Sequence, residues 1–382
     1  MTSFLLGIAF LLSWLNFEHQ KETDNQLSLL FIGDIMGHGP QIKAAFNDST
    51  KTYSYNSMFK YINKEVEAAD FTIANLEVTL AGKPFQGYPQ FSSPDALALA
   101  CKNNGIDAFV MANNHSCDRG ADGIIRSIDV VEKLNLLHTG TFKNKKDRDS
   151  LNLMILEKNN IKVGVLNYTY GTNGLKFPAP TYVNMIDTAL IAEDIIAAKE
   201  KGLDKLIVFT HWGKEYKEQP DSYQLNTAQF LFSKNVDIVI GSHPHVLQKM
   251  IYVPNNESRD NLNESFIVYS LGNYVSNQRD RRKDGGCMVK LILEKKPDGV
   301  HIVECGYLLT WVYKKLTDNK YDYHVLPCSK FEKDSLFFSN KEDFSKMKVF
   351  IDDSRKLFKE HNLSVNEYTY QDSTWSVNEI NN

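Results

Sequence analysis

The chain has 382 residues, of which 42% are hydrophobic and 24% are charged, and its formal net charge is −4. These values are typical of a globular protein with one large α/β domain or two smaller ones. They exclude the strongly basic surface of a typical nucleic-acid-binding protein, and we expect no nucleic-acid partner.

The first segment of the chain is apolar. Residues 4–15 form a run that is too short to cross a membrane and is typical of the hydrophobic region of a signal peptide, although no Lys or Arg precedes it. A polar stretch over residues 16–26 reads as a linker. We therefore expect residues 1–26 to be a signal-like or anchor segment, and the protein to be exported or membrane-tethered and extracytoplasmic. The alternative is an ordinary terminal helix that packs on the domain.

From residue 27 onward, strand-like and helix-like segments alternate. Strands are expected at residues 27–32, 71–76, 108–111, 161–167, 206–210, 236–240 and 265–270. Helices are expected at residues 94–104, 120–134, 188–201 and 222–234. This alternation predicts an α/β domain over residues 27–310. The alternation fades from about Trp311, so residues 311–382 are expected to form a C-terminal extension with an amphipathic helix near residues 339–359.

Polar side chains of the metal-binding kind follow these strands. The set supplies two carboxylates, one amide oxygen and three imidazoles, from Asp34, Glu77, Asn114, His211, His243 and His245. Each residue alone has a simpler explanation, such as a helix N-cap for the aspartate. Together they predict one shared site, because ligands of open α/β sheets bind beyond the carboxyl ends of the strands.

This mixture of nitrogen and oxygen donors suits Mn, Fe, Zn or Ni, and the absence of thiolates argues against a structural zinc site. A single cation rarely takes six such ligands, whereas two cations bridged by a carboxylate would use them all. Pairs of that kind activate water in phosphate-ester hydrolysis.

Six motifs, in their order and spacing, resemble those of the CapA family of poly-γ-glutamate capsule biosynthesis, a branch of the calcineurin-like metallophosphoesterase superfamily. They are GDIMG at 33–37, ANLE at 74–77, NNHSCDRG at 113–120, HWGKEY at 211–216, GSHPHV at 241–246 and SLGNY at 270–274. The resemblance covers about residues 27–307 and implies a four-layer αββα sandwich around a metal centre.

The resemblance implies one or two divalent transition-metal ions (Mn, Fe or Zn) and assigns their ligands. Asp34 and His245 would bind the first metal and Glu77 would bridge both. The ligands of the second metal would be Asn114, His211 and His243.

The superfamily usually has a histidine two residues after the first aspartate, and this chain has Met36 there. Either His38 supplies the missing nitrogen or the first metal site is weak.

The resemblance also implies residues that act on the substrate. His115 would contact the transferring group, and Asp118 would orient His115. Further candidate substrate contacts are His38, Asn173 and Asn273. The Asn173-Gly174 pair is explained equally well as a plain turn.

Three functions follow as hypotheses. The first is a metal-dependent, phosphoesterase-like hydrolase in capsule or poly-γ-glutamate biosynthesis, with an anionic polymer or a phosphoester as substrate. The second is a non-hydrolytic accessory or polymer-binding subunit whose partner is a membrane-bound capsule synthase. The third is a cytosolic phosphatase whose N-terminal helix is structural.

We predict that the chain from about residue 25 onward lies outside the cytoplasm, because of the apolar run at residues 4–15. A reporter enzyme that is active only outside the cytoplasm, fused after Gln26, should be active in cells. A fusion that is stable but inactive would contradict export.

Overall fold

The computed structural model describes residues 25–254, 264–371 and 373–377. The apolar run at residues 4–15 lies outside these ranges, so export stays a prediction. Among the helices that the structure describes, none has the length and hydrophobicity needed to cross a membrane.

The larger of two main sheets has ten strands, with the path β20-β19-β17-β16-β1-β4-β5-β6. Its parallel part consists of β1 (Gln26–Ile35), β4 (Phe71–Leu76), β5 (Ala108–Val110) and β6 (Leu137–Thr139). The short strand β15 (Asn273–Val275) pairs with β1 in parallel. Next to β1 lies an antiparallel part, β16 (Gly285–Lys296), β17 (Gly299–Thr317) and β18 (Lys320–Pro327). The last strands are β19 (Asn366–Gln371) and β20 (Thr374–Val377).

The smaller main sheet has six strands in the order β13-β14-β12-β11-β9-β8. Four of them are parallel, namely β9 (Ile161–Thr169), β11 (Lys205–His211), β12 (Ile238–Ser242) and β14 (Ser265–Leu271). The antiparallel edge strands are β8 (Met154–Lys158) and β13 (Leu247–Val253). Two further pairs form small sheets, β2 (Phe46–Asn47) with β3 (Thr52–Tyr53) and β7 (Thr141–Phe142) with β10 (Tyr182–Val183).

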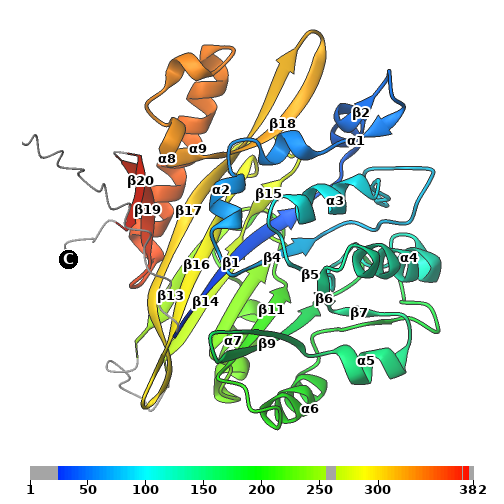
Figure 1. Ribbon diagram of the computed structural model, residues 1–382, viewed down its shortest axis with the longest axis vertical. Coiled ribbons are helices and arrows are strands. Elements are labelled where there is room, and N and C mark those ends of the chain that lie inside the picture. Colours follow the sequence, from blue (N-terminus) through cyan, green and yellow to red (C-terminus); the bar gives the residue numbers. More distant parts are fainter. Residues whose placement is uncertain (1–24, 255–263, 372, 378–382) are drawn as a thin grey trace, which may run out of the picture.

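The two main sheets pack face to face and helices cover both outer faces (Figure 1). Strand β1 is continuously apolar over residues 29–32 because both of its faces are buried there: Leu29 and Phe31 face the core between the sheets, whereas Leu30 and Ile32 face the helical side. On that side lie α3 (Ala96–Asn103) and α4 (Gly120–Lys133), and the smaller sheet is covered by α6 (Thr188–Lys199) and α7 (Ser222–Ser233). The expected four-layer αββα sandwich is thus confirmed.

The remaining helices are short, apart from one near the C-terminus. They are α1 (Gly39–Ala45), α2 (Asn63–Glu67), α5 (Lys145–Leu151), α8 (Cys328–Phe331) and two 3-10 turns, Asn56–Phe59 and Ser335–Phe337. The long helix α9 (Lys341–His361) confirms the helix expected near residues 339–359 and packs Phe350 and Ile351 into the core between the sheets. Strand β17 runs across residue 310, and the domain limits 27–310 and 311–382 stay predictions.

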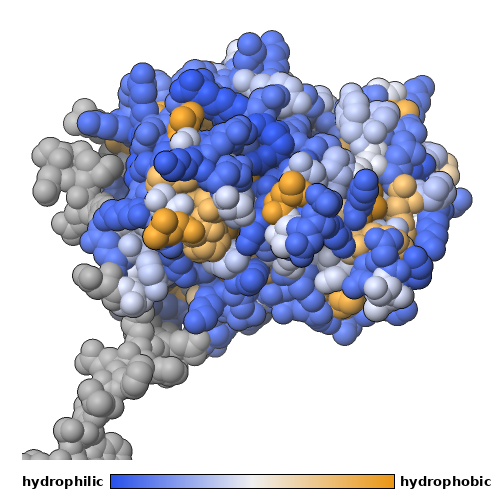
Figure 2. All heavy atoms as spheres, turned by 90° about the horizontal axis from the view of Figure 1, so that it is seen from above, coloured by the Kyte–Doolittle hydropathy of each residue, from blue (hydrophilic) through white to orange (hydrophobic). Residues whose placement is uncertain are grey.

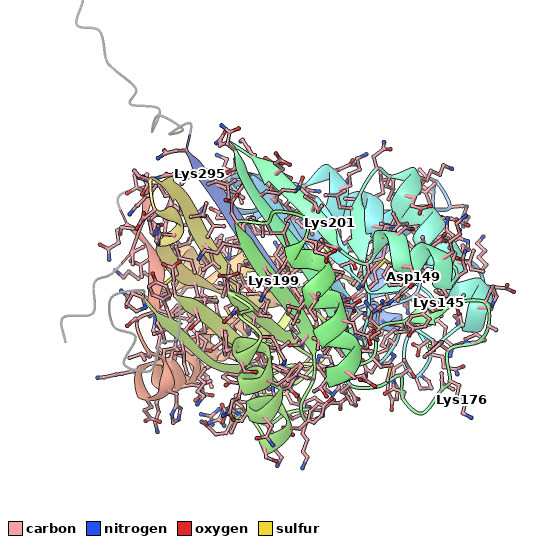
Figure 3. All side chains as sticks on the ribbon, turned by 90° about the horizontal axis from the view of Figure 1, so that it is seen from below. Lys145, Asp149, Lys176, Lys199, Lys201 and Lys295 are labelled. Atoms are coloured by element: carbon pink, nitrogen blue, oxygen red, sulfur yellow. The ribbon has the colours of Figure 1, made fainter. Side chains whose placement is uncertain are left out.

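The outer faces of the helices carry charged side chains. Figure 3 shows Lys145, Asp149 and Lys199 on the face seen from below, and the first two form an ion pair of 2.8 Å within α5. The face seen from above in Figure 2 is also largely hydrophilic, with hydrophobic residues in separate patches. Both views are typical of helices and loops that present polar side chains to solvent.

Gly33 lies where β1 passes closest to the connection between β14 and β15. A β-carbon at Gly33 would be 2.2 Å from the carbonyl oxygen of Gly272. The same oxygen accepts a hydrogen bond of 3.1 Å from the backbone N–H of Asp34. A residue without a side chain is therefore required immediately before Asp34.

We predict that Gly33→Ala lowers the free energy of unfolding by about 2 kcal/mol, because the new methyl group must displace backbone rather than a flexible side chain. Gly39→Ala is the matched control, since a β-carbon there would meet no atom within 4 Å. Urea denaturation of both variants measures the difference. Equal stability of the two variants would contradict this account of β1.

Candidate metal centre

The polar residues that follow the strands meet at one edge of the sandwich. Asp34 is the second-to-last residue of β1 and Glu77 follows β4 in the larger sheet, whereas His211 ends β11 and His243 follows β12 in the smaller sheet. Strand β1 is parallel to β4 and β11 is parallel to β12, so within each sheet the two carboxyl ends point the same way, and the donor atoms from both sheets lie close together. Two sheets therefore contribute to a single buried site.

The donor atoms fall into two groups that share one residue. Glu77 lies with His211 and His243 in one group and with Asp34 and His245 in the other. Within each group the candidate ligand atoms lie within 4.8 Å of one another. Asn114 adds to the first group, because its Oδ1 lies 2.9 Å from His211 Nε2. The six residues expected from the sequence thus come together, while their roles as ligands stay predictions.

Glu77 is fully buried and neither of its carboxylate oxygens has a hydrogen-bond partner. Its Oε1 lies 3.5 Å from His211 Nε2 and 3.7 Å from His245 Nε2. An isolated buried carboxylate is strongly unfavourable unless a positive charge compensates it. The two groups of nitrogen and oxygen donors around this carboxylate fit divalent transition-metal ions.

The buried environment shifts the protonation of these groups. Burial, reinforced by the charges of Asp34 and Glu215, raises the pKa of Glu77 well above its usual range. Burial lowers the pKa of His211 to about 3 and that of His243 well below its ordinary value. Both imidazoles are therefore neutral at physiological pH, which is the form that binds a metal.

Asp34 behaves differently from Glu77. Burial alone would raise its pKa, but the hydrogen bond and charge of His245, with the hydrogen bond of Asn75, lower it. His245 Nδ1 lies 3.1 Å from Asp34 Oδ2, and Asn75 donates a 2.8 Å hydrogen bond to Asp34 Oδ1. Asp34 is therefore held as a charged carboxylate.

Neighbouring side chains orient the candidate ligands. Ser242 Oγ lies 2.9 Å from His211 Nδ1, and Asn273 Oδ1 lies 3.1 Å from His245 Nδ1. Such contacts fix the ring orientation of metal-binding histidines. The sequence reasoning assigned no role to Asn75 or Ser242. The sequence signal for Asn75 was a lone amide within the apolar run of β4. Its position opposite Asp34 is known only from the strand register in the structure.

The backbone is unusual at two of the histidines. His243 has φ of 97° and His245 has φ of 57°, with Pro244 between them. Positive φ is uncommon for residues other than glycine and is concentrated at functional sites, where the surrounding structure enforces it. This turn aims one imidazole at each donor group.

His115 stands apart from both donor groups. Its Nδ1 lies 2.8 Å from Asp118 Oδ2, which also accepts a 2.7 Å hydrogen bond from the backbone N–H of Phe91. The Phe91 ring packs edge-on against His115 with 4.6 Å between centroids. Asp118 and Phe91 thus fix the imidazole, while the role of His115 toward a substrate stays a prediction.

His38 and Met36 bear on which residues make up the first donor group. Met36 is buried in the apolar core under the helices. His38 Nδ1 lies 3.1 Å from Gln41 Oε1, and His38 belongs to neither donor group found among the described residues. Of the two alternatives, this geometry favours a first site with fewer protein ligands than the second.

Two tyrosines form the rim of the site. The Tyr170 ring lies 4.6 Å from the His243 ring, and the Tyr216 ring lies 6.2 Å from that of His245. Both tyrosines are partly exposed, at 38% and 45%. Asn173 is exposed near Tyr170, and its Oδ1 accepts a 3.3 Å hydrogen bond from Asn114. The candidate substrate contacts Asn173, Asn273 and His38 thus surround the donors rather than joining them.

Comparisons with known proteins agree on one family. Residues 28–278 match the model of the family described as bacterial capsule synthesis protein PGA_cap. The chain is 28% identical over 284 residues to the capsule biosynthesis protein CapA of Bacillus anthracis, covering 71% of this chain and 65% of that protein. It is 27% identical over 286 residues to the PGA biosynthesis protein CapA of Bacillus subtilis strain 168, covering 72% and 70% respectively.

The chain therefore spans slightly less than two thirds of the Bacillus anthracis relative. Among solved structures, it is similar to the calcineurin-like phosphoesterase YfkN from Bacillus subtilis, with a TM-score of 0.43 and 15% identity. That match covers 75% of this chain and 90% of YfkN.

We predict that Glu77→Gln makes the protein more stable than the wild type without metal and less stable than the wild type with metal. Because the pKa of Glu77 is higher in the folded state than in the unfolded state, its protonated form stabilises the folded protein at pH values below the ordinary pKa of glutamate. This stabilisation is lost as the pH rises through the folded-state pKa. At about pH 8 without metal, the variant should therefore unfold at a higher temperature than the wild type. With Mn²⁺ at about 100 times its dissociation constant, the wild type should gain roughly 2.7 kcal/mol and the variant far less.

Thermal unfolding with and without Mn²⁺ tests this reversal. At about pH 4, where an unperturbed glutamate is largely protonated, the variant and the wild type should unfold at more similar temperatures without metal. An equal gain from Mn²⁺ in both proteins would show that Glu77 is not a shared ligand.

Proposed function

Because the chain belongs to the bacterial capsule synthesis protein family PGA_cap, we propose that it is a metal-dependent hydrolase that acts on an anionic polymer or a phosphoester during the synthesis of a capsule or another cell-surface polymer. The observation that carries this proposal is Glu77, a buried carboxylate without hydrogen bonds that belongs to two donor groups at once. A carboxylate in that position is suited to bridge two cations.

The chain would hold the cations with the two donor groups already described. Glu77, His211, His243 and Asn114 would serve one cation, and Glu77, Asp34 and His245 the other. Bound divalent cations supply activation of water and neutralisation of developing negative charge. The neutral imidazoles and the charged Asp34 are ready to bind without first releasing protons.

His115 would act on the substrate rather than on a cation. Asp118 accepts a hydrogen bond from Nδ1–H, so Nε2 is the nitrogen left for the substrate, and it can present a proton only when the ring carries a second proton. Donation from Nε2 to a substrate oxygen would stabilise charge that develops there or protonate a leaving group. Phe91 excludes water from one side of the imidazole and keeps this geometry.

Location and partners form part of the proposal. Capsule polymers lie outside the cell, and the names of both relatives place them in capsule or PGA biosynthesis. We propose that this chain works outside the cytoplasm, beside a membrane-bound synthase. The apolar run at residues 4–15 supports an exported or tethered protein.

A second function is favoured by the depth of the site. All six candidate ligands are at most 2% exposed, and Tyr170 and Tyr216 line the rim. So deep a centre is also compatible with a metal that only stabilises a polymer-binding subunit. In that case the protein would bind metal fully and still not hydrolyse any ester.

We predict that the purified protein hydrolyses a generic phosphodiester in the presence of Mn²⁺, and that His115→Ala lowers kcat roughly 100-fold to 1,000-fold without loss of bound metal. The reason is that His115 is a member of neither donor group and its Nδ1 pairs with Asp118. Steady-state kinetics and elemental analysis of the same samples give both readouts.

His301→Ala provides the matched control, because His301 forms a similar pair with Asp298, three residues earlier and on the surface. It should change neither turnover nor metal content. A wild-type protein with full metal content but no turnover of any phosphoester would contradict the hydrolase and favour the accessory subunit. Loss of metal in His115→Ala would contradict the role given to this histidine.

A further inference from the structure

Two positive side chains beside the metal centre have no carboxylate partner among the described residues. Lys314 on β17 donates a 3.0 Å hydrogen bond to Asn277 Oδ1, a neutral acceptor. Arg279 follows β15 and lies over the ring of Trp311, with 5.3 Å to the ring centre. Its Nη1 is buried without a hydrogen-bond partner. The contacts that hold each of these side chains are therefore with uncharged groups, an amide oxygen for Lys314 and an indole ring for Arg279.

The two cations lie near each other, because Lys314 contacts Asn277, two residues before Arg279, and Arg279 lies over Trp311, three residues before Lys314. Burial, followed by the charge of Arg279, lowers the pKa of Lys314. Tyr323 shares the acceptor of Lys314, since its hydroxyl donates a 2.5 Å hydrogen bond to Asn277 Oδ1. Like charges in a partly buried place repel each other unless an anion compensates them.

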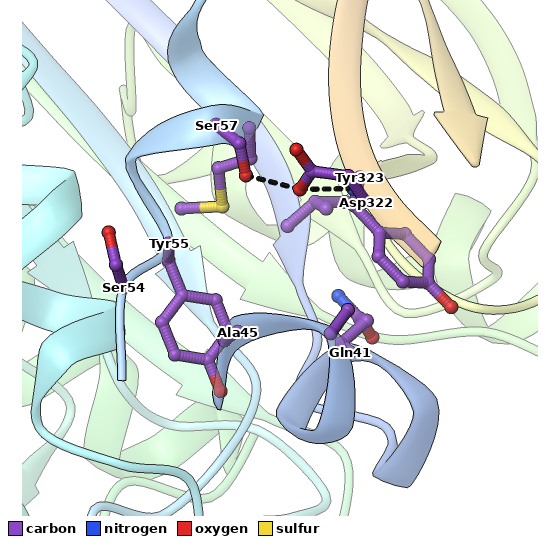
Figure 4. Close-up of a pocket in the computed structure, with 10 residues that line it drawn as sticks. Gln41, Ala45, Ser54, Tyr55, Ser57, Asp322 and Tyr323 are labelled. Atoms are coloured by element: carbon purple, nitrogen blue, oxygen red, sulfur yellow. Dashed lines mark hydrogen bonds between the residues drawn. The ribbon is translucent and has the colours of Figure 1, made fainter. Parts of the chain in front are cut away.

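The nearest acidic residue along β18 does not neutralise this pair. Asp322 lies opposite Lys315, whereas Tyr323 lies opposite Lys314, so alternation turns Asp322 to the other face of the sheet. There it accepts a 2.5 Å hydrogen bond from Ser57 Oγ (Figure 4).

Asp284 is a second acidic neighbour, and it offsets at most one of the two charges. One of its oxygens accepts a 2.7 Å hydrogen bond from Trp311 Nε1, and the other has no partner. Its charge acts to raise the pKa of Arg279, against the lowering effect of burial. The charge of Asp343 acts on the pKa of Arg279 in the same direction. Neither carboxylate forms an ion pair with Arg279 or Lys314 among the described residues, so both cations keep donors for an added anion.

A short chain of contacts joins these cations to the metal centre. The backbone N–H of Asn277 donates a 3.4 Å hydrogen bond to His38 Nδ1. Gln278 makes two hydrogen bonds on this side. Its Nε2 donates to the hydroxyl of Tyr216 at the rim (3.3 Å), and its Oε1 accepts from Nδ2 of Asn273 (3.0 Å). One loop thus contacts the metal centre on one side and the cation pair on the other.

We propose that Arg279 and Lys314 form a subsite for an anionic group, a carboxylate or a phosphate, on the same substrate whose reacting group lies at the metal centre. That the anionic group belongs to a substrate rests on the function proposed above, whereas the binding of an anion by Arg279 and Lys314 does not depend on that function. An anionic polymer fits this arrangement, because it carries negative groups at a distance from the bond that reacts. Charge-assisted hydrogen bonds from both cations would fix the position of such a group.

The test uses the full protein and a fluorescently labelled polyglutamate peptide, with binding measured by anisotropy at low salt. Lys314→Gln and Arg279→Gln should each weaken binding roughly tenfold, as expected for loss of a charge-assisted contact. Lys290→Gln is the matched control, since Lys290 is a partly buried lysine of the same sheet that lies over a tyrosine ring, 5.6 Å from its centre. It should leave binding unchanged. Labelled polyphosphate provides the second arm and shows which anion the subsite prefers.

His243→Ala separates this proposal from the proposed function. That variant should lose metal and turnover but retain binding of the polyanion, because His243 does not contact the cation pair. Wild-type affinity for both polyanions in Lys314→Gln would overturn the subsite, as would a wild type that binds neither. If Arg279→Gln lowers the melting temperature but leaves affinity unchanged, Arg279 serves only as a partner of Asp284, and its part in the subsite is wrong.

Discussion

The burial of Glu77 is the constraint on which the rest of the site depends. A fully buried carboxylate without a hydrogen bond is unfavourable in a protein interior. The chain nevertheless surrounds it with a second carboxylate, Asp34, and with imidazoles that burial keeps neutral. This arrangement is poor as a way to stabilise the folded chain alone and well suited to a cluster of cations. Metal bound as proposed above would relieve this local instability of the folded chain.

The two sheets explain how so many donors reach one point. Parallel strands in both sheets end at the same edge of the sandwich, and each contributes the residue at or just beyond its last hydrogen-bonded position. Close backbone contact is needed for this convergence, which is why Gly33 precedes Asp34. The turn with positive φ at His243 and His245 then divides the imidazoles between the two donor groups. The loop after β15 extends the same edge toward Arg279 and Lys314.

Much of this arrangement could be predicted from the sequence, for a physical reason. Strands such as β4 are buried on both faces, so they appear as apolar runs, and the polar residue that ends each run marks the functional edge. The antiparallel strands β16, β17 and β18 could not be found in this way, because their exposed face carries charged residues that interrupt the apolar pattern. The contact between Asn75 and Asp34 depends on strand register, which one sequence does not reveal. The proximity of Arg279 and Lys314 could not be predicted either, because one lies in the loop after β15 and the other on β17.

The central claim is that Glu77 is shared by two metal ions. Anomalous X-ray diffraction from crystals grown with Mn²⁺ tests it most directly. The account predicts two anomalous peaks, each about 2.0–2.2 Å from an oxygen of Glu77, with His211 and His243 beside one and Asp34 and His245 beside the other. Crystals that contain Mn²⁺ but show no peak near Glu77, or one peak coordinated without it, would contradict the account.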